Sequence, residues 1–321
     1  MASISVVIPV KNEAAGLGAC LDGILGQTVA VDEILVIDSG STDGTQDIVR
    51  ACPQARLLEI APGDFNHGDT RNLGVRETSG DLVLFTVGDA RPADDRWIER
   101  MRDGFVADDV AAVGGLQVVA HDPANNPLEW YRPVSKPVRS VHRFGSAEAF
   151  DAASPAEKQA ACVIDDVTSM YRRAFITGTP FRHAVYGEDM LICIDALRSG
   201  HALVREPAAC VYHCHLENYE TTLKRTVVVC LMRHELFGTV PDEPSFQPLR
   251  EAVRLLRIPS LTPGQKLYWW RNRRECVRGL VDGIAIFRKA RAEGTEALSA
   301  LYRDYLGAPP VPLKRGRTEA A

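Results

Sequence analysis

Two carboxylates stand directly after apolar stretches of the chain. Five of the six residues 82–87 are apolar and lead into Gly88 and Asp89, and Asp38 ends a similar stretch. Runs of this kind predict buried strands of a parallel sheet. Ligands bind outside the carboxyl ends of such strands, so both aspartates are candidates for binding a ligand or a metal. The other interpretation of Asp89 is a turn residue that caps the following helix.

Polar residues after the first two predicted strands could contact a nucleotide. Ser39 opens a turn rich in serine, threonine and glycine (SGSTDGT, 39–45), and helix N-termini and backbone amide groups hold phosphates. The segment matches neither the dinucleotide fingerprint nor the P-loop, so a capping turn is the stronger interpretation. Asn12 and Glu13 follow the apolar residues 3–10 and could either hydrogen-bond a nucleobase or ribose or cap a helix.

Glu188 and Asp189 begin a predicted helix and could supply an acid–base group. A helix N-terminus stabilises negative charge and keeps a carboxylate ionised, ready to take a proton. Acids are also common in the first turn of a helix for that same reason, so a purely structural interpretation stays open.

Two histidines near residue 214 could bind a metal. His213 and His215 lie on one face of an extended segment, because strand side chains alternate with a period of two. With carboxylates nearby they could form a metal site. A zinc cluster of Cys210, His213, Cys214 and His215 fits poorly, because alternation places these four side chains on opposite faces.

The first 120 residues alternate between two kinds of pattern. Apolar, β-branched strands are predicted at 3–10, 32–40, 55–60, 81–87 and 110–120. Helices are predicted at 14–26, 41–52, 68–80 and 94–104. This alternation predicts an α/β fold with a mostly parallel sheet flanked by helices. The carboxyl ends of these parallel strands share one edge of the sheet, so Asp38 and Asp89 would then face one crevice.

The pattern weakens between residues 121 and 160, where Pro123, Pro127, Pro133 and Pro137 predict a long loop over the sheet. Beyond it, we expect ordered structure at 162–176, a helix at 187–200, an extended segment at 202–215, helices at 219–238 and 264–306, and a polar tail after residue 307. The fold therefore gains a helical C-terminal extension.

Composition places the chain among soluble globular proteins. It has 321 residues, 45% hydrophobic and 25% charged, with a net charge of −5, which gives no indication of nucleic-acid binding. No apolar run reaches the roughly 18 residues needed to span a bilayer. The start shows no secretory signal, and the eight cysteines are scattered with no C-x-x-C pair. We therefore expect reduced thiols and a cytoplasmic protein.

The order of these segments resembles one enzyme family. SVVIPVKNEAAGLG, EILVIDSGSTDGT, FNHGDTRNLGV, VGDARP, GEDM and HCH follow one another as in the family 2 glycosyltransferases, which have the Rossmann-like GT-A fold. The resemblance covers about residues 3–240. FNHGDTRN followed by HCHLENY is similar to the rhamnosyltransferase-like branch.

The resemblance implies a role for each matching position. Asp38 would bind the nucleobase and Ser39 the ribose side. The other positions of the donor pocket would be Pro9, Asn12, Glu13, His67, Arg71, Asn72 and Gly88, with Arg71 offsetting diphosphate charge. Asp89 would hold a divalent metal, Mg²⁺ or Mn²⁺, with His213, while Glu188 and Asp189 match the pair whose aspartate is the catalytic base.

One position departs from the family pattern. The first acid of the metal-binding D-X-D motif is replaced by Val87, so Asp89 lacks its usual partner. The branch that this chain resembles also keeps a single acid here. Metal binding would then depend on the donor phosphates, as is common for Mg²⁺.

The implied activity is inverting, metal-dependent transfer of a sugar, rhamnose by resemblance, from a nucleotide-diphospho-sugar to a hydroxyl of a glycan or polyprenol-linked acceptor. The domains would be a glycosyltransferase domain at 1–240, with a nucleotide-sugar half at 1–120 and an acceptor half at 121–240, and a helical extension at 241–321. Two alternatives are a nucleotidyltransferase, whose basic, glycine-rich pyrophosphate loop is missing, and a non-catalytic sugar-nucleotide binder.

A basic, aromatic helix at 266–291 suggests peripheral contact with the inner face of the membrane. The other interpretation is a solvated helix whose apolar side packs on the protein.

Overall fold

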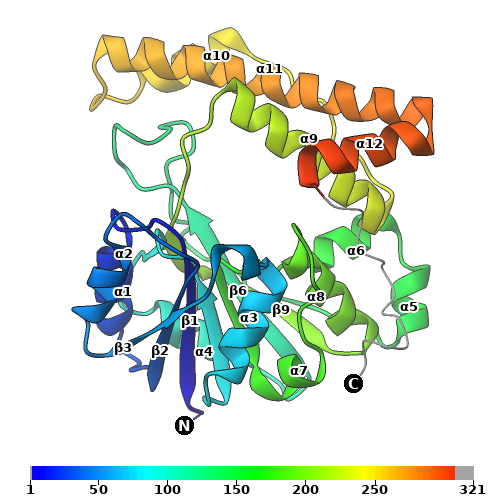
Figure 1. The fold of residues 1–321 in the computed structure, drawn as a ribbon. Coiled ribbons are helices and arrows are strands. Elements are labelled where there is room, and N and C mark those ends of the chain that lie inside the picture. The colour runs from blue at the N-terminus through cyan, green and yellow to red at the C-terminus, as the bar shows by residue number, and fades with distance from the viewer. Residues whose placement is uncertain (1, 308–321) are drawn as a thin grey trace. The chain divides into compact units, whose positions relative to one another are not determined.

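The computed structural model describes residues 2–307, so the predicted polar tail lies outside the described residues. The chain forms two compact units (Figure 1). Unit 1 combines Met1–Val118 with Pro133–His213, and unit 2 combines Val119–Arg132 with Cys214–Ala321. The boundaries expected at 120 and 240 stay a prediction, because compact packing does not by itself define a functional domain.

Unit 1 is built on a nine-stranded sheet in the order β3-β2-β1-β4-β8-β6-β9-β5, with β7 also paired to β9. The strands are β1 (Ile4–Val10), β2 (Glu33–Asp38), β3 (Ala55–Glu59), β4 (Leu82–Thr86), β5 (Arg91–Pro92), β6 (Val110–Val118), β7 (Ser140–His142), β8 (Thr168–Arg172) and β9 (Ala202–Tyr212). β1 to β4 run parallel, β8 reverses, and β6 and β9 again run with β4. The predicted mostly parallel sheet is confirmed, with β5, β7 and β8 as the reversed strands.

Helices cover both faces of this sheet. They are α1 (Leu17–Leu25), α2 (Thr45–Arg50), the 3₁₀ turn η1 (Pro62–Asp64), α3 (His67–Arg76), α4 (Trp97–Arg102), α5 (Ala147–Ala152), α6 (Pro155–Ala161), α7 (Arg173–Gly178) and α8 (Glu188–Arg198). Alternate residues of β1, such as Val6 and Ile8, join the core formed with α1 and α4. Val7 points the other way, toward α3, where a side chain at Gly74 would collide with it at 2.4 Å.

The segment predicted as a long loop at 121–160 contains regular structure, so that prediction was wrong in part. β7 and α5 lie within it, and α6 begins in it. Ser154 accepts a hydrogen bond from the backbone N–H of Glu157, whose side chain bonds back to Ser154. This is the S-x-x-E capping box, with Pro155 at the first helical position. Pro155 therefore begins a helix in this segment and does not mark a loop.

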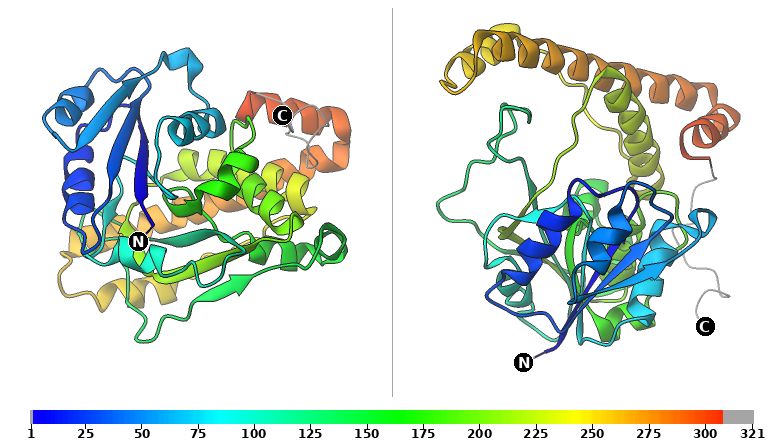
Figure 2. Two further views of the ribbon diagram at one scale, coloured as in Figure 1. Left: turned by 90° about the horizontal axis from the view of Figure 1, so that it is seen from below. Right: turned by 60° about the vertical axis from the view of Figure 1, so that its left-hand side comes forward.

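Unit 2 consists largely of four helices: α9 (Tyr219–Phe237), α10 (Pro248–Leu256), α11 (Pro263–Glu293) and α12 (Thr295–Leu306). The predicted helical segments at 219–238 and 264–306 are confirmed, with a break at Gly294, whose φ is 107°. In the right-hand view of Figure 2, α9 crosses the long α11, and α12 lies against the C-terminal end of α11. No helix among residues 2–307 is long and apolar enough to cross a membrane.

Small residues allow α9 and α11 to pack closely. A Cβ atom on Gly279 would lie 2.7 Å from the carbonyl oxygen of Tyr219, and one on Gly283 would lie 2.8 Å from the Cβ of Thr226. Beside this crossing, Ile284 and Phe287 of α11 are buried with Leu231 of α9. A cavity of about 500 Å³ also lies within unit 2, between α9, α11 and residues 241–244.

Candidate active site

The predicted site residues of unit 1 gather at the carboxyl edge of its sheet. Asp38 is the last residue of β2, where it pairs with Val10 of β1. Asp89 lies three residues beyond β4, and His213 directly follows β9. Because these strands run in one direction, their carboxyl ends share one edge, as the alternating pattern predicted.

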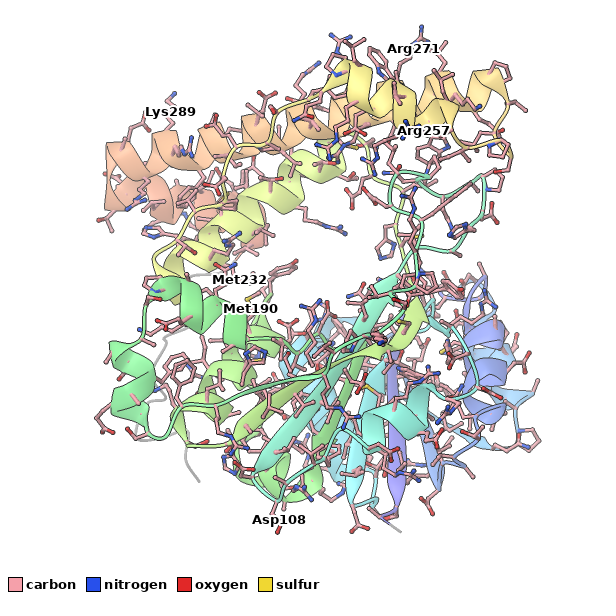
Figure 3. All side chains as sticks on the ribbon, turned by 180° about the vertical axis from the view of Figure 1, so that it is seen from behind. Asp108, Met190, Met232, Arg257, Arg271 and Lys289 are labelled. Carbon is pink, nitrogen blue, oxygen red and sulfur yellow. The ribbon has the colours of Figure 1, made fainter. Side chains whose placement is uncertain are left out.

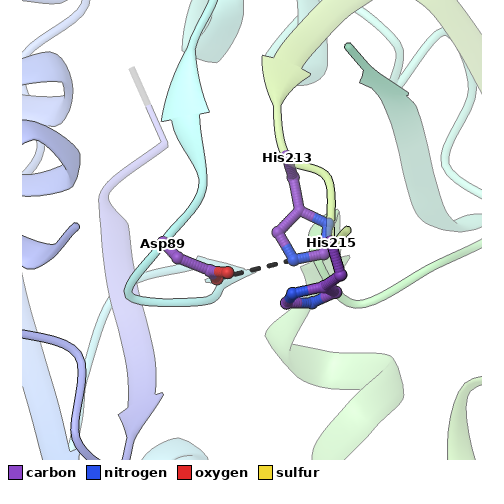
Figure 4. A group of neighbouring side chains, drawn as sticks. All are labelled: Asp89, His213 and His215. Carbon is purple, nitrogen blue, oxygen red and sulfur yellow. Dashed lines mark ion pairs between the residues drawn. The ribbon is translucent and has the colours of Figure 1, made fainter. Parts of the chain in front are cut away.

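Asp89 and His213 face each other at this edge (Figure 4). His213 Nε2 lies 3.5 Å from Asp89 Oδ1, and the side chains are 11% and 29% exposed, respectively. Figure 4 also draws His215, two residues further along the chain, which is again a metal-ligand type. A carboxylate and an imidazole in this arrangement fit a divalent metal that also takes phosphate oxygens.

Gln117 of β6 fixes the orientation of the His213 ring. Its Oε1 lies 2.7 Å from His213 Nδ1, while its Nε2 donates to a carboxylate oxygen of Asp165. A carboxylate only accepts, so the Gln117 amide is oriented with its oxygen toward the histidine. In the neutral ring the hydrogen then sits on Nδ1, and the Nε2 lone pair faces Asp89.

Glu13 and Gly88 lie beside Asp89. A Cβ atom on Gly88 would lie 2.9 Å from Glu13 Cβ and 3.0 Å from Val10 Cγ1, so only glycine fits at this position. Partial burial raises the pKa of Glu13, and the carboxylates of Asp89 and Asp43 raise it further, while His213 lowers it. The local field is therefore negative and would be relieved by a cation.

The loop after β2 is organised around Asp38. Its Oδ1 accepts hydrogen bonds from the backbone N–H groups of Gly40 and Ser41 and from Gln46 Nε2. Burial alone would raise the pKa of Asp38, but these hydrogen bonds hold it below its usual value. Among the described residues its buried Oδ2 has no hydrogen-bond partner, which leaves an ionised carboxylate with acceptor capacity unused.

Other residues of the loops after β1 and β2 make internal contacts. Asn12 adopts a positive φ of 58°, its N–H donates to Ser41 Oγ, and its Oδ1 accepts from the N–H of Thr42. Ser39 is buried, and its Oγ donates to the carbonyl of Val10. Pro9 is part of β1 and half-buried. These contacts hold the β1 and β2 loops together, and no contact in the structure tests the ribose role of Ser39.

A second charged cluster, which we call the buried triad, contains Arg71, Asp166 and Glu188. Arg71 Nη1 donates to Glu188 Oε1 at 2.6 Å, and its Nε lies 3.1 Å from Asp166 Oδ2. The three side chains are 7%, 2% and 9% exposed. Asp166 also accepts from the hydroxyls of Ser169 and Tyr171.

Burial raises the pKa of Asp166 to about 6, although Arg71 opposes the rise. The guanidinium of Arg71 is thus committed to two carboxylates, and its predicted contact with a diphosphate stays a prediction. What the structure does show is that Arg71 fixes Glu188, and therefore the start of α8.

Asp189 follows Glu188 in the first turn of α8 and is half-buried. Burial raises its pKa well above the ordinary range of an aspartate, and the carboxylates of Glu188, Asp166 and Asp165 raise it further. Its Oδ1 accepts from the N–H of Met190 at 2.7 Å. A raised pKa makes a carboxylate a stronger base, which suits proton transfer near neutral pH.

The two remaining predicted residues lie on α3. Asn72 exchanges two hydrogen bonds with the backbone of Phe181, through Nδ2 at 2.8 Å and Oδ1 at 2.9 Å. His67 Nδ1 lies 4.0 Å from Glu188 Oε1, and burial lowers the pKa of its ring. Asn72 therefore ties the segment before α8 to α3, while the half-exposed His67 adjoins Glu188.

The sequence interpretation missed two residues of this site. Gln117 is an uncharged polar residue in an otherwise apolar strand, a signal that could have been noticed. Asp166 gave a weaker signal, since it precedes β8 as one of two consecutive aspartates. Its burial beneath Arg71 depends on contacts 95 residues apart along the chain.

Comparison with known proteins agrees with this geometry. The model of the family "Glycosyl transferase family 2" matches residues 5–176, more than half of the chain. This chain belongs to glycosyl transferase family 2. The resemblance to family 2 glycosyltransferases that the sequence shows is therefore confirmed, and the chain is a family 2 glycosyltransferase.

Curated relatives include two rhamnosyltransferases. The chain is 30% identical over 224 residues to the O-antigen chain rhamnosyltransferase RfbN of Salmonella typhimurium, covering 66% of each protein. It is 27% identical over 228 residues to the O-antigen chain rhamnosyltransferase WbaN of Salmonella anatum, covering 67% of each. The chain thus spans about two thirds of the length of these relatives. The similarity supports the rhamnosyltransferase-like branch.

Solved structures show the same fold. A mannosyltransferase from Pyrobaculum calidifontis, in complex with GDP-Man and Mn²⁺, aligns with a TM-score of 0.54 at 17% identity, covering 94% of this chain and 79% of that one. Residues 1–349 of S. aureus TarS, in complex with UDP-GlcNAc, align with a TM-score of 0.51 at 15% identity, covering 89% and 92%. The predicted GT-A fold is confirmed.

Proposed function

We propose that this glycosyltransferase moves a sugar from a nucleotide-diphospho-sugar to a hydroxyl of a glycan or lipid-linked acceptor, with inversion at the anomeric carbon and with a divalent metal bound. The observation that carries the proposal is the shared edge of unit 1, where Asp89 and His213 face each other and Asp189 lies in the first turn of α8. The relatives RfbN and WbaN support rhamnose as the sugar.

The donor would bind along the loops after β1 and β2. Asp38 offers an unused acceptor oxygen for an N–H of the base, and the loops held by Asn12 and Ser41 form the wall beside it. A donor diphosphate lying against Asp89 and Glu13 would meet negative charge, and a cation between them would remove that repulsion.

Asp89 and His213 would hold the metal, with His215 close behind in the chain. When bound, Mn²⁺ or Mg²⁺ would stabilise the charge that develops on the leaving diphosphate. Gln117 keeps the His213 Nε2 lone pair directed toward this position. The donor set fits such an ion, since it combines one carboxylate and one imidazole, and phosphate oxygens of the donor would complete the coordination.

Asp189 would act as the base. Its ionised carboxylate takes the proton of an acceptor hydroxyl while that oxygen forms a bond to the anomeric carbon and the bond to the diphosphate oxygen breaks. Glu188, held by Arg71, would position the start of α8 and keep the pKa of Asp189 high through its charge. A single displacement of this kind inverts the configuration.

The test measures the binding of a panel of dTDP-, UDP- and GDP-sugars, with and without Mn²⁺ or Mg²⁺. Calorimetry and thermal shift report the binding. We expect one nucleotide class to bind only with metal, and binding to disappear in Asp89→Ala. Asp95→Ala is the matched control, an exposed acid six residues further along the chain, beyond β5. Binding that needs no metal and survives in Asp89→Ala would contradict the metal assignment.

A donor labelled in either the sugar or the phosphate then identifies the group that is transferred. Transfer of the sugar label to the acceptor supports the proposal. Transfer of the phosphate label would indicate nucleotidyl transfer instead.

A further inference from the structure

Helix α10 in unit 2 carries an apolar stripe on its outer side. Leu249, Val253 and Leu256 are 83%, 45% and 67% exposed, and their spacing of four and three places them on one helical face. Leu255 on the other side is 1% exposed and packs against Leu261 and Trp269. The helix is therefore apolar on both sides, and the inner side alone accounts for its packing.

The start of α11 extends this apolar surface. Trp270 Nε1 donates to the carbonyl of Pro248, and Lys266 Nζ donates to the carbonyl of Leu256, so α10 lies along the first turns of α11 (Figure 1). Leu267 and Tyr268 in those turns are 49% and 54% exposed. Five of the fourteen exposed large apolar side chains among the described residues thus lie within 249–268.

Positive charge surrounds the stripe. Residues 248–274 contain seven basic residues and one acid, a net charge of +6 in a chain whose net charge is −5. Only Arg254 of the seven forms an ion pair in the described structure, with Glu251. Arg250, Arg257, Arg271 and Arg274 are exposed, and Figure 3 labels Arg257 and Arg271 in this region.

The apolar side of the later part of α11 is buried, so it cannot contribute to this exposed apolar surface. Val277, Ile284, Phe287 and Ala290 are buried within unit 2. The contact predicted for 266–291 as a whole is therefore limited to the first turns of α11, and the apolar part comes mainly from α10, which the sequence interpretation did not identify.

We propose that the α10 surface, meaning residues 248–257 with 266–274, docks on an anionic lipid membrane. Leucine and valine side chains would enter the boundary between headgroups and acyl chains while the arginines contact the lipid phosphates. The same charge disfavours a second copy of the chain as the occupant, because a symmetric contact would place +6 against +6. Membrane docking itself is argued from the surface alone. Only its benefit rests on the proposed function, since docking would bring the enzyme to a lipid-linked acceptor.

The experiment is co-sedimentation of the full chain with vesicles of phosphatidylcholine alone or mixed with phosphatidylglycerol, without donor or acceptor. We expect binding to the mixed vesicles that weakens with salt, and little binding to phosphatidylcholine alone. The double variant Leu249→Gln with Leu256→Gln should bind at least about tenfold less, since it removes two large apolar groups from the contact.

The matched control is Val134→Gln with Val138→Gln, which changes two equally exposed apolar residues of unit 1, at 68% and 79% exposure. This control should bind like the unchanged chain. Equal binding by both double variants, or no preference for anionic vesicles, would overturn the docking surface. Sedimentation without lipid that shows a dimer lost only in the α10 variant would assign the stripe to a second copy instead.

The outcome is separable from the proposed activity. Sugar transfer to a water-soluble acceptor should be unchanged in the α10 double variant, because neither leucine belongs to the site in unit 1. A chain that binds vesicles but transfers no sugar would retain the docking surface and remove the proposed function.

Discussion

The carboxyl edge of unit 1 holds two charged clusters that differ in what satisfies them. In the buried triad, Arg71 contacts both Asp166 and Glu188, and all three side chains are less than 10% exposed. At the Asp89–His213 pair, the carboxylate is 29% exposed and raises the pKa of its neighbour Glu13. Charges that are paired within the protein position the chain, whereas a partly exposed excess of one sign is suited to a ligand. The comparison therefore divides positioning residues from binding residues.

The largest expected effect separates Asp189 from the buried triad beside it. Asp189→Asn removes the proposed base while keeping size and packing, so transfer should fall by about 10²–10⁴-fold with donor binding retained. Steady-state kinetics and calorimetry check this. Glu220→Gln is the control, an exposed acid in the first turn of α9. Normal turnover in Asp189→Asn would remove the base assignment.

The next prediction tests whether the triad is structural. Arg71→Met leaves two buried carboxylates without their cation, and the free energy of unfolding should fall by about 3–5 kcal/mol. Arg50→Met is matched, because Arg50 also contacts two acids, Asp47 and Glu59, but is 53% exposed. It should cost less than about 1 kcal/mol. Urea denaturation measures both, and equal losses would break the comparison.

A smaller effect is expected at Gln117, which connects His213 to Asp165. Gln117→Met keeps the volume but removes the acceptor for His213 Nδ1, so Mn²⁺ affinity should fall by about 10–100-fold. Gln117→Glu retains an acceptor oxygen and should recover part of that loss. Electron paramagnetic resonance of Mn²⁺ in the presence of nucleoside diphosphate reports affinity without turnover. Unchanged affinity in Gln117→Met would show that the ring needs no such support.

The smallest effect is a displaced pH profile. A base must be ionised to take a proton, and burial raises the pKa of Asp189, so kcat/KM should fall with acid at a pH above the ordinary aspartate pKa of about 3.9. Glu188→Gln removes the neighbouring charge, so the acid-side fall of kcat/KM should move to lower pH. Folding is verified at each pH. If the acid-side fall of kcat/KM stays at the same pH in this variant, another group controls it.

Most of the fold could be predicted because its strands carry local signals. β1, β2 and β4 are apolar runs with polar residues at their carboxyl ends, and their parallel order follows from the helices between them. The reversed strand β8 could not be predicted, since its direction depends on pairing with β4 and β6 far along the chain. α10 was missed although Leu249, Val253 and Leu256 recur at a helical spacing. Its nine residues stand among the prolines at 241, 244, 248, 259 and 263, which indicate loops.

The site divides in the same way. Asp38, Asp89 and Asp189 were predicted from their places at strand and helix ends. Gln117 and Asp166 act only through partners brought together by folding, and no local pattern marks such pairs. Arg71 was recognised as important, but its two carboxylate partners could be found only from the structure.

The pairing of β6 with β9 carries a further consequence. Gly114 pairs with Arg205 and Leu116 with Cys210, so two steps on β6 match five on β9. The excess is odd, and side chains alternate along a strand, so this irregularity decides which face of β9 meets Gln117. Gln117 pairs with Val211, and His213, two residues on, shares its face. The metal pair is thus specified by a count of residues as well as by their identity. Deleting one residue from 206–209 would turn His213 away from Gln117 and Asp89 while leaving every residue of the site in the sequence.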